Sequence, residues 1–68
     1  MLKCYILAVL VRRRFGSYDP VDISCAVYAD YGKSIAADRI AGECRHLADE
    51  GWLHENDKGR YAARVKTV

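Results

Sequence analysis

Residues 29–53, ADYGKSIAADRIAGECRHLADEGWL, contain a break in hydrophobic phase that restricts how this chain can fold. The apolar residues of the second half share one helical stripe at about 100° per residue: Ile40, Cys44 and Leu47. Ile35 would face the opposite side of the same helix, and Gly32 would lie in its interior. We therefore expect two helices joined by a turn at Gly32–Ser34, with Ile35 filling the corner between them.

Cap residues predict two helices before this turn. Apolar spacing from Leu2 onward indicates a first helix that stops near Gly16, where a left-handed C-cap is sterically free. The sequence DPVD starts a second helix, with Asp19 as N-cap and Pro20 at the first helical position, and this helix runs to about Tyr31. Apolar residues surround most of its circumference, so we expect it to be packed on more than one side.

The remainder predicts a third helix and a hairpin. The third helix runs from Ala36 to Glu50 and ends at Gly51, and the segments WLHEN and GRYAARVKT then flank the turn signal NDKG. The second segment alternates an apolar set with a basic one: Tyr61, Ala63 and Val65 against Arg60, Ala62, Arg64 and Lys66. The expected class is α+β, mainly α, with a single domain over residues 1–68.

Composition and residue patterns argue against several function classes. The chain has 68 residues, a net charge of +2 and an apolar fraction of 51%, which suits one small folded domain rather than a large enzyme. The first apolar run is too short to cross a membrane, and no catalytic, cofactor or metal motif is evident. We interpret Cys4, Cys25 and Cys44 as small buried apolar residues in a reducing cytoplasm, and expect Cys44 and His46 to face opposite sides of one helix.

The order of elements and the segment IAADRIAGECRHLADEGWLHENDKGRYAARV resemble the winged helix-turn-helix superfamily. Matching features are an apolar turn residue (Ile35), spaced apolar helix positions, a Gly followed by apolar residues (Gly51, Trp52, Leu53) and a charged hairpin. The resemblance implies a third helix that enters the DNA major groove and a wing that touches the backbone or the minor groove. Some members of the superfamily bind RNA, or only other proteins.

We expect a small double-stranded DNA-binding protein, either a transcriptional regulator or an accessory factor of a mobile element. An arginine can address guanine, an acid can accept from cytosine, and a glycine allows close backbone approach. Cations at a hairpin tip reach phosphates or a narrow minor groove. The candidate contacts lie in the turn, on the third helix and on the wing: Lys33, Asp38, Arg39, Gly42, Arg45, His46, Lys58, Arg60 and Arg64.

Other interpretations stay open. The same fold could serve as a protein-protein interaction module whose mixed charges pair with a partner, and either a homodimer or a larger partner fits the sequence. Arg12, Arg13 and Arg14 complement the dipole of the first helix or contact a nucleic-acid backbone. Trp52 and Tyr61 could stack on unpaired bases, but we interpret both as core residues.

Overall fold

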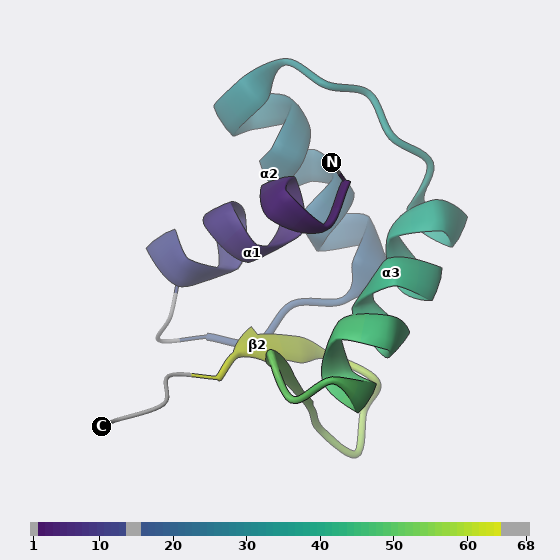
Figure 1. The fold of residues 1–68 in the computed structure, drawn as a ribbon. Coiled ribbons are helices and arrows are strands. Elements are labelled where there is room, and N and C mark those ends of the chain that lie inside the picture. The colour runs from purple at the N-terminus through teal and green to yellow at the C-terminus, as the bar shows by residue number, and fades with distance from the viewer. Residues whose placement is uncertain (1, 14–15, 65–68) are drawn as a thin grey trace.

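Three helices followed by an antiparallel hairpin form the described part of the chain, residues 2–13 and 16–64 of a computed structural model (Figure 1). The elements are α1 (Leu2–Arg12), α2 (Pro20–Tyr31), α3 (Ala37–Asp49), β1 (Leu53–Glu55) and β2 (Tyr61–Ala63). The mainly α class and the order of elements are as the sequence predicts. The predictions for Arg14, Val65 and Lys66 fall outside the described residues.

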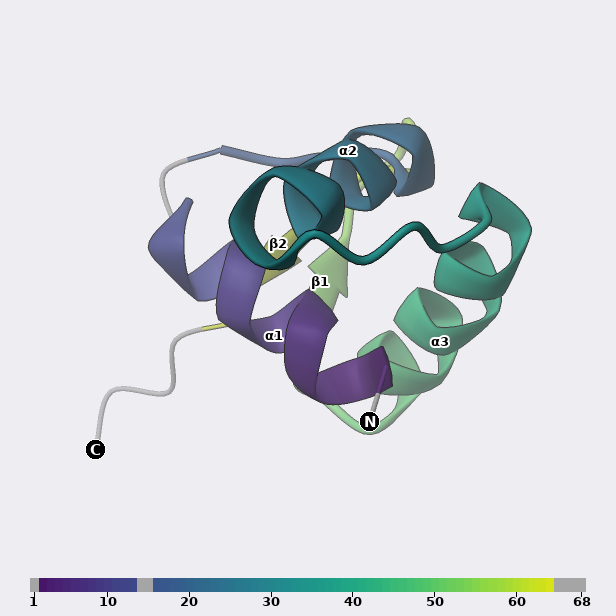
Figure 2. The same ribbon diagram turned by 90° about the horizontal axis from the view of Figure 1, so that it is seen from above.

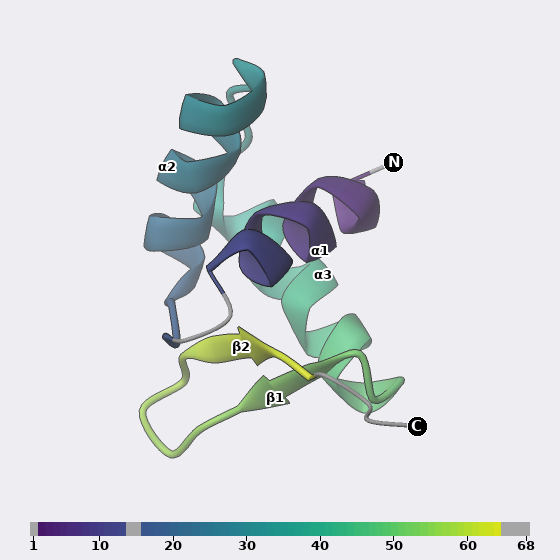
Figure 3. The same ribbon diagram turned by 90° about the vertical axis from the view of Figure 1, so that its left-hand side faces the viewer.

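The three helices pack around one core, and the hairpin covers one end of the bundle (Figures 2 and 3). The core draws side chains from all five elements: Ile6, Val9, Leu10, Ile23, Val27, Ile40, Cys44, Leu47, Leu53 and Tyr61. The α3 members are the stripe identified in the sequence. The opposite side of α3 therefore faces away from the core.

The cap residues position α2 as the sequence predicts. The Asp19 carboxylate accepts a hydrogen bond from the Asp22 backbone N–H at 2.8 Å, and Pro20 begins the helix. At the other end Gly32 has φ 69°, a left-handed conformation that glycine adopts without strain. The Gly32 N–H donates to the Tyr28 carbonyl, which satisfies the last turn.

The prediction that α2 is packed on more than one side is only half right. The helix contacts both α1 and α3, but Val21, Cys25 and Tyr28 are exposed. Only Ile23 and Val27 are fully buried in α2. The outward apolar residues of α2 therefore form an uncovered face and do not pack against a third element within the described residues.

An ion pair joins the end of α1 to α2. The Arg13 guanidinium donates two hydrogen bonds to the Asp30 carboxylate, at 2.8 and 3.1 Å, and Arg12 approaches the same group at 3.7 Å. Arg13 also donates to the Val9 carbonyl. Helix α1 ends at Arg12 rather than near Gly16, and the Arg13 backbone N–H donates to the Leu10 carbonyl at 3.1 Å in a tighter last turn.

Ile35 lies in the connection between α2 and α3 and packs against the core, as expected, but it is half-buried rather than enclosed. The Ser24 hydroxyl donates to the Ile35 carbonyl at 2.6 Å and ties the connection to α2. Helix α3 starts after Ala36 without a side-chain cap. Packing therefore positions this helix, with no help from an N-cap side chain.

The hairpin is attached to the helices through a bridge that the sequence analysis missed. Strands β1 and β2 pair antiparallel, with Leu53 opposite Ala63 and Glu55 opposite Tyr61. On the other side of β2, Tyr18 and Tyr61 exchange two backbone hydrogen bonds of 2.8 and 2.7 Å. A single bridging residue leaves no periodic signal, so the pattern around Tyr18 could not reveal it.

Replacing Ile35 tests the packing of the connection. We expect Ile35→Ala to lower the free energy of unfolding by about 1–2 kcal/mol, below the ~2–5 kcal/mol of fully enclosed sites because the side chain is half-buried. Urea unfolding measures the change. Val11→Ala, at a valine that is 57% exposed, is the control and should change stability by less than about 0.5 kcal/mol. An equally small effect of Ile35→Ala would contradict the packing role.

Replacing Asp30 tests the ion pair through its pH dependence. The hydrogen bond from Arg13 lowers the pKa of Asp30 below its ordinary value of 3.8. The stabilisation is therefore complete above that pH and is lost as the pH falls through the lower pKa of the folded state. We expect Asp30→Asn to destabilise the protein at neutral pH and to converge with wild type in acid, as measured by urea unfolding.

Asp49→Asn, at an exposed position at the end of α3, is the control and should follow wild type throughout. A stability difference between wild type and Asp30→Asn that does not change with pH would rule out an ionic contribution from Asp30.

Candidate nucleic-acid interface

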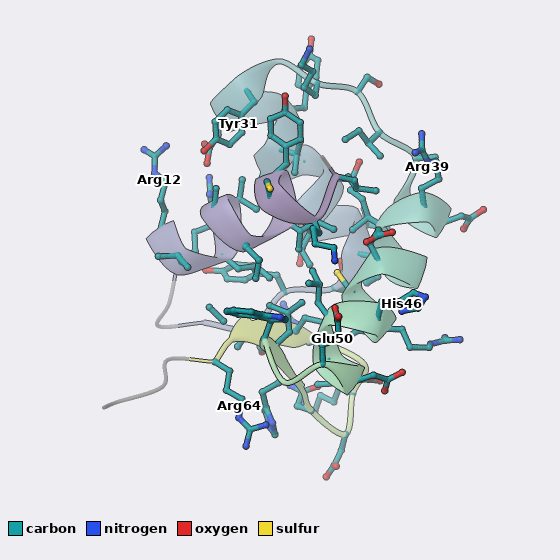
Figure 4. All side chains as sticks on the ribbon, in the orientation of Figure 1. Arg12, Tyr31, Arg39, His46, Glu50 and Arg64 are labelled. Carbon is teal, nitrogen blue, oxygen red and sulfur yellow. The ribbon has the colours of Figure 1, made fainter. Side chains whose placement is uncertain are left out.

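The candidate residues of α3 occupy its solvent face. Ile40, Cys44 and Leu47 are fully buried, and the five candidates are all exposed: Asp38, Arg39, Gly42, Arg45 and His46. Figure 4 shows the Arg39 and His46 side chains extending outward from α3. The division of this helix into a buried stripe and a polar face is as the sequence predicts.

A shallow hollow lies on this face where α3 meets the first turn of α1. Its volume is about 470 Å³, and its lining includes Leu2 and Lys3 from α1 together with Arg39, Gly42 and His46 from α3. A Cβ added to Gly42 would meet nothing within 4 Å. Intramolecular packing therefore does not require glycine here, although glycine in a helix costs about 1 kcal/mol relative to alanine.

Both halves of α3 carry charges of both signs. The N-terminal half carries Arg39 together with Asp38 and Glu43 and follows the exposed Lys33, and a helix N-terminus itself has positive dipole character. Its C-terminal end carries Asp49 and Glu50, and Glu50 pairs with Lys3 at 3.8 Å. Figure 4 shows Glu50 at the opposite end of the helix from Arg39. Lys33 and the helix dipole thus favour an anionic partner at the N-terminal end, although the two halves carry equal numbers of acidic side chains.

A side-chain cap shapes the hairpin tip. The Asn56 carboxamide oxygen accepts from the backbone N–H groups of Lys58 and Arg60, both at 2.9 Å. Gly59 has φ 73°, which the turn requires and which a residue with a Cβ rarely adopts. This arrangement leaves the Lys58 side chain exposed at the tip.

Lys58 and Arg60 are not equivalent, although the sequence treats them alike. The Arg60 guanidinium is directed to α2, where it lies 3.5 Å from the Asp22 carboxylate. Its Nε is buried and has no hydrogen-bond partner among the described residues. Lys58 is therefore the tip cation, and Arg60 connects the hairpin to α2.

Arg64 lies apart from the other candidates. Its backbone N–H donates to the Trp52 carbonyl and extends the hairpin pairing beyond β2. Figure 4 shows its side chain below the hairpin, away from Arg39 and His46. The structure brings the α3 candidates onto one face but does not bring Arg64 to it.

The two aromatic residues interpreted as core differ in the structure. Tyr61 is buried, with 4% of its surface exposed, but Trp52 is 55% exposed, so the core prediction for Trp52 is wrong. Leu53 occupies the adjacent inward position, and side chains alternate between faces along extended chain. Burial raises the pKa of the Tyr61 hydroxyl, and nearby Glu55 adds to this effect.

The cysteine prediction also holds only in part. Cys44 is buried, and burial raises the pKa of its thiol to about 12. Cys4 and Cys25 are exposed, because they lie on the outer faces of α1 and α2. Cys44 and His46 face opposite sides of α3, as expected. In the described ranges, no three His, Cys, Asp or Glu residues are grouped to hold a metal ion.

None of the helices in the described part of the chain is both long and apolar enough to cross a membrane. Comparisons with protein-family models, with curated proteins and with solved structures find no match to this chain.

Replacing Gly42 tests whether glycine serves the fold. Because the added methyl group meets open space, Gly42→Ala should raise the free energy of unfolding by about 1 kcal/mol, as measured by urea unfolding. Gly32→Ala is the contrasting control, since φ 69° at that position makes the substitution destabilising. A loss of stability in Gly42→Ala would mean that the fold itself requires this glycine.

Proposed function

We propose that this protein is a winged helix protein that binds duplex DNA, with the N-terminal half of α3 in the major groove and the hairpin tip on the backbone. The observation that carries the proposal is Gly42, a helical glycine on the solvent face that packing does not require. A glycine there lets the helix backbone approach a partner closely. Exposed arginines on the same face, Arg39 and Arg45, supply the chemistry to read bases.

The charges of this surface support the orientation. Lys33 precedes α3, Arg39 lies in its first half with the acids Asp38 and Glu43, and the acids Asp49 and Glu50 lie at its far end. If α3 inserts its N-terminal half into the groove, Asp49 and Glu50 stay away from the phosphates, which would otherwise repel them. Lys58 at the hairpin tip is free to reach the backbone, and we assign Arg60 a smaller role because it is directed to Asp22.

The two kinds of contact predict different effects on affinity. Arg39 would read a base edge, so its loss should matter at one position of the site. Lys58 and Lys33 would contact phosphate, and such contacts bind all sequences alike. Asp38 could accept a hydrogen bond from cytosine, and His46 lies one turn beyond Gly42 on the same face.

The salt dependence of binding tests the phosphate contact. A neutralised phosphate releases counterions, so Lys58→Ala should weaken binding to all duplexes and lower the slope of log affinity against log salt by about 1. Arg12→Ala removes the same charge on the side of the molecule away from α3 (Figure 4) and should leave the slope unchanged. Titration of labelled duplex at several salt concentrations measures both, and equal slopes for the two variants would exclude the tip as a contact.

Base preference tests the α3 contact. After selection of preferred sites from random duplexes, Arg39→Ala should lose about 1–3 kcal/mol of discrimination at one base pair and retain most non-specific binding. Glu50→Gln, at the other end of the helix, serves as the control and should keep the wild-type preference. A uniform loss across all sequences would assign Arg39 to the backbone instead.

One observation favours the alternative of a protein-binding module. Asp38 and Glu43 line the hollow on α3 together with the cations, and such mixed charges suit a partner with charges of both signs. If wild-type protein shows no salt-dependent affinity for any duplex at low ionic strength, the DNA proposal fails and this alternative takes its place.

A further inference from the structure

The outward face of α2 has an apolar centre. Val21, Cys25 and Tyr28 follow one another at the spacing of a single helical stripe, and Val21 and Tyr28 are 59% and 63% exposed. The exposed Ala29 widens the stripe. Solvent faces of helices normally carry charged residues, and a contiguous apolar patch marks an interaction site. The stripe therefore differs from the isolated exposed Val11 and Trp52.

Both charged side chains of α2 are engaged in ion pairs within the chain. Asp30 is held by Arg13, and Asp22 lies at the margin, where it contacts Arg60. Duplex DNA does not match an apolar surface, because binding to its phosphate backbone requires cationic side chains. The partner of this face must instead offer an apolar surface of its own.

A hollow of about 410 Å³ adjoins the stripe. Ala26, Ala29 and Cys25 contribute small side chains to its lining, and Asp22 and Arg60 contribute polar groups. Such a hollow accommodates an aromatic ring that carries a hydroxyl group, because the ring meets apolar atoms and the hydroxyl meets polar ones. Tyr28, on the same face, has this chemistry.

We infer that this face binds a second copy of the chain, with the two α2 helices antiparallel about a two-fold axis at Cys25. Tyr28 lies three residues after Cys25 and Asp22 three residues before it. The two-fold axis therefore places the Tyr28 of each copy over the hollow beside Asp22 of the other. Each copy supplies the same projecting side chain and the same hollow, as a two-fold interface requires.

The charges at the ends of α2 agree with this arrangement. Asp19 and Asp22 lie at its start, and Lys33 follows its end. Antiparallel packing brings the acidic end of one copy to the basic end of the other and opposes the helix dipoles. One helix face covers less than the ~800 Å² per partner of a standard interface. We therefore expect a weak dimer that forms only at high protein concentration.

Sedimentation equilibrium of the full chain without DNA tests this inference, and its outcome does not depend on the proposed function. Wild type should shift from monomer to dimer with rising concentration. Val21→Glu should abolish the dimer, and Val11→Lys, at a valine of matched exposure on α1, should retain it. Each new charge suits the dipole at its own helix end, so both variants should fold, which circular dichroism verifies.

The exposed cysteines provide a test of the axis. A short bis-maleimide should cross-link wild type and Cys4→Ser into dimers, and Cys25→Ser should remain uncross-linked. A chain that stays monomeric at millimolar concentration would overturn the inference. A dimer that survives Val21→Glu, or that cross-links through Cys4, would overturn the assignment to this face.

Discussion

The hydrogen bonds between Tyr18 and Tyr61 determine how the hairpin sits on the helices. They fix β2 against the segment that leads into α2, and the buried Tyr61 side chain anchors the same strand in the core. β1 then follows from its pairing with β2. Because Asp19 begins the cap of α2 immediately after Tyr18, one short segment positions both the hairpin and the second helix. The distance between the hairpin tip and α3 depends on this attachment.

The features that the sequence predicted well are those that local physical chemistry determines. Asp19, Pro20 and Gly32 define the ends of α2 through groups within a few residues, and the stripe of Ile40, Cys44 and Leu47 follows from helical periodicity. The phase break at Ile35 correctly located the connection. These signals require no knowledge of distant parts of the chain.

The predictions that failed needed long-range information. A helix with apolar residues around its circumference looks buried in sequence, and only the placement of α1 and α3 shows that Val21, Cys25 and Tyr28 are exposed. The sequence predicted Arg60 as a binding residue, but in the structure its guanidinium contacts Asp22, which is 38 positions away in the sequence. For the candidate site, the sequence predicted which α3 residues are exposed, but not that Arg64 lies apart from them.

The contact between Arg60 and Asp22 has a consequence for communication within this small domain. Arg60 belongs to the hairpin loop, whereas Asp22 borders the apolar stripe of α2. If a molecule bound at the hairpin draws Arg60 away from Asp22, it changes the charge presented beside the α2 stripe. By thermodynamic reciprocity, a partner on the α2 face that favours one position of Arg60 would then change the affinity for that molecule by the same factor. Binding at the hairpin and binding at the α2 face would then be coupled through a single ion pair.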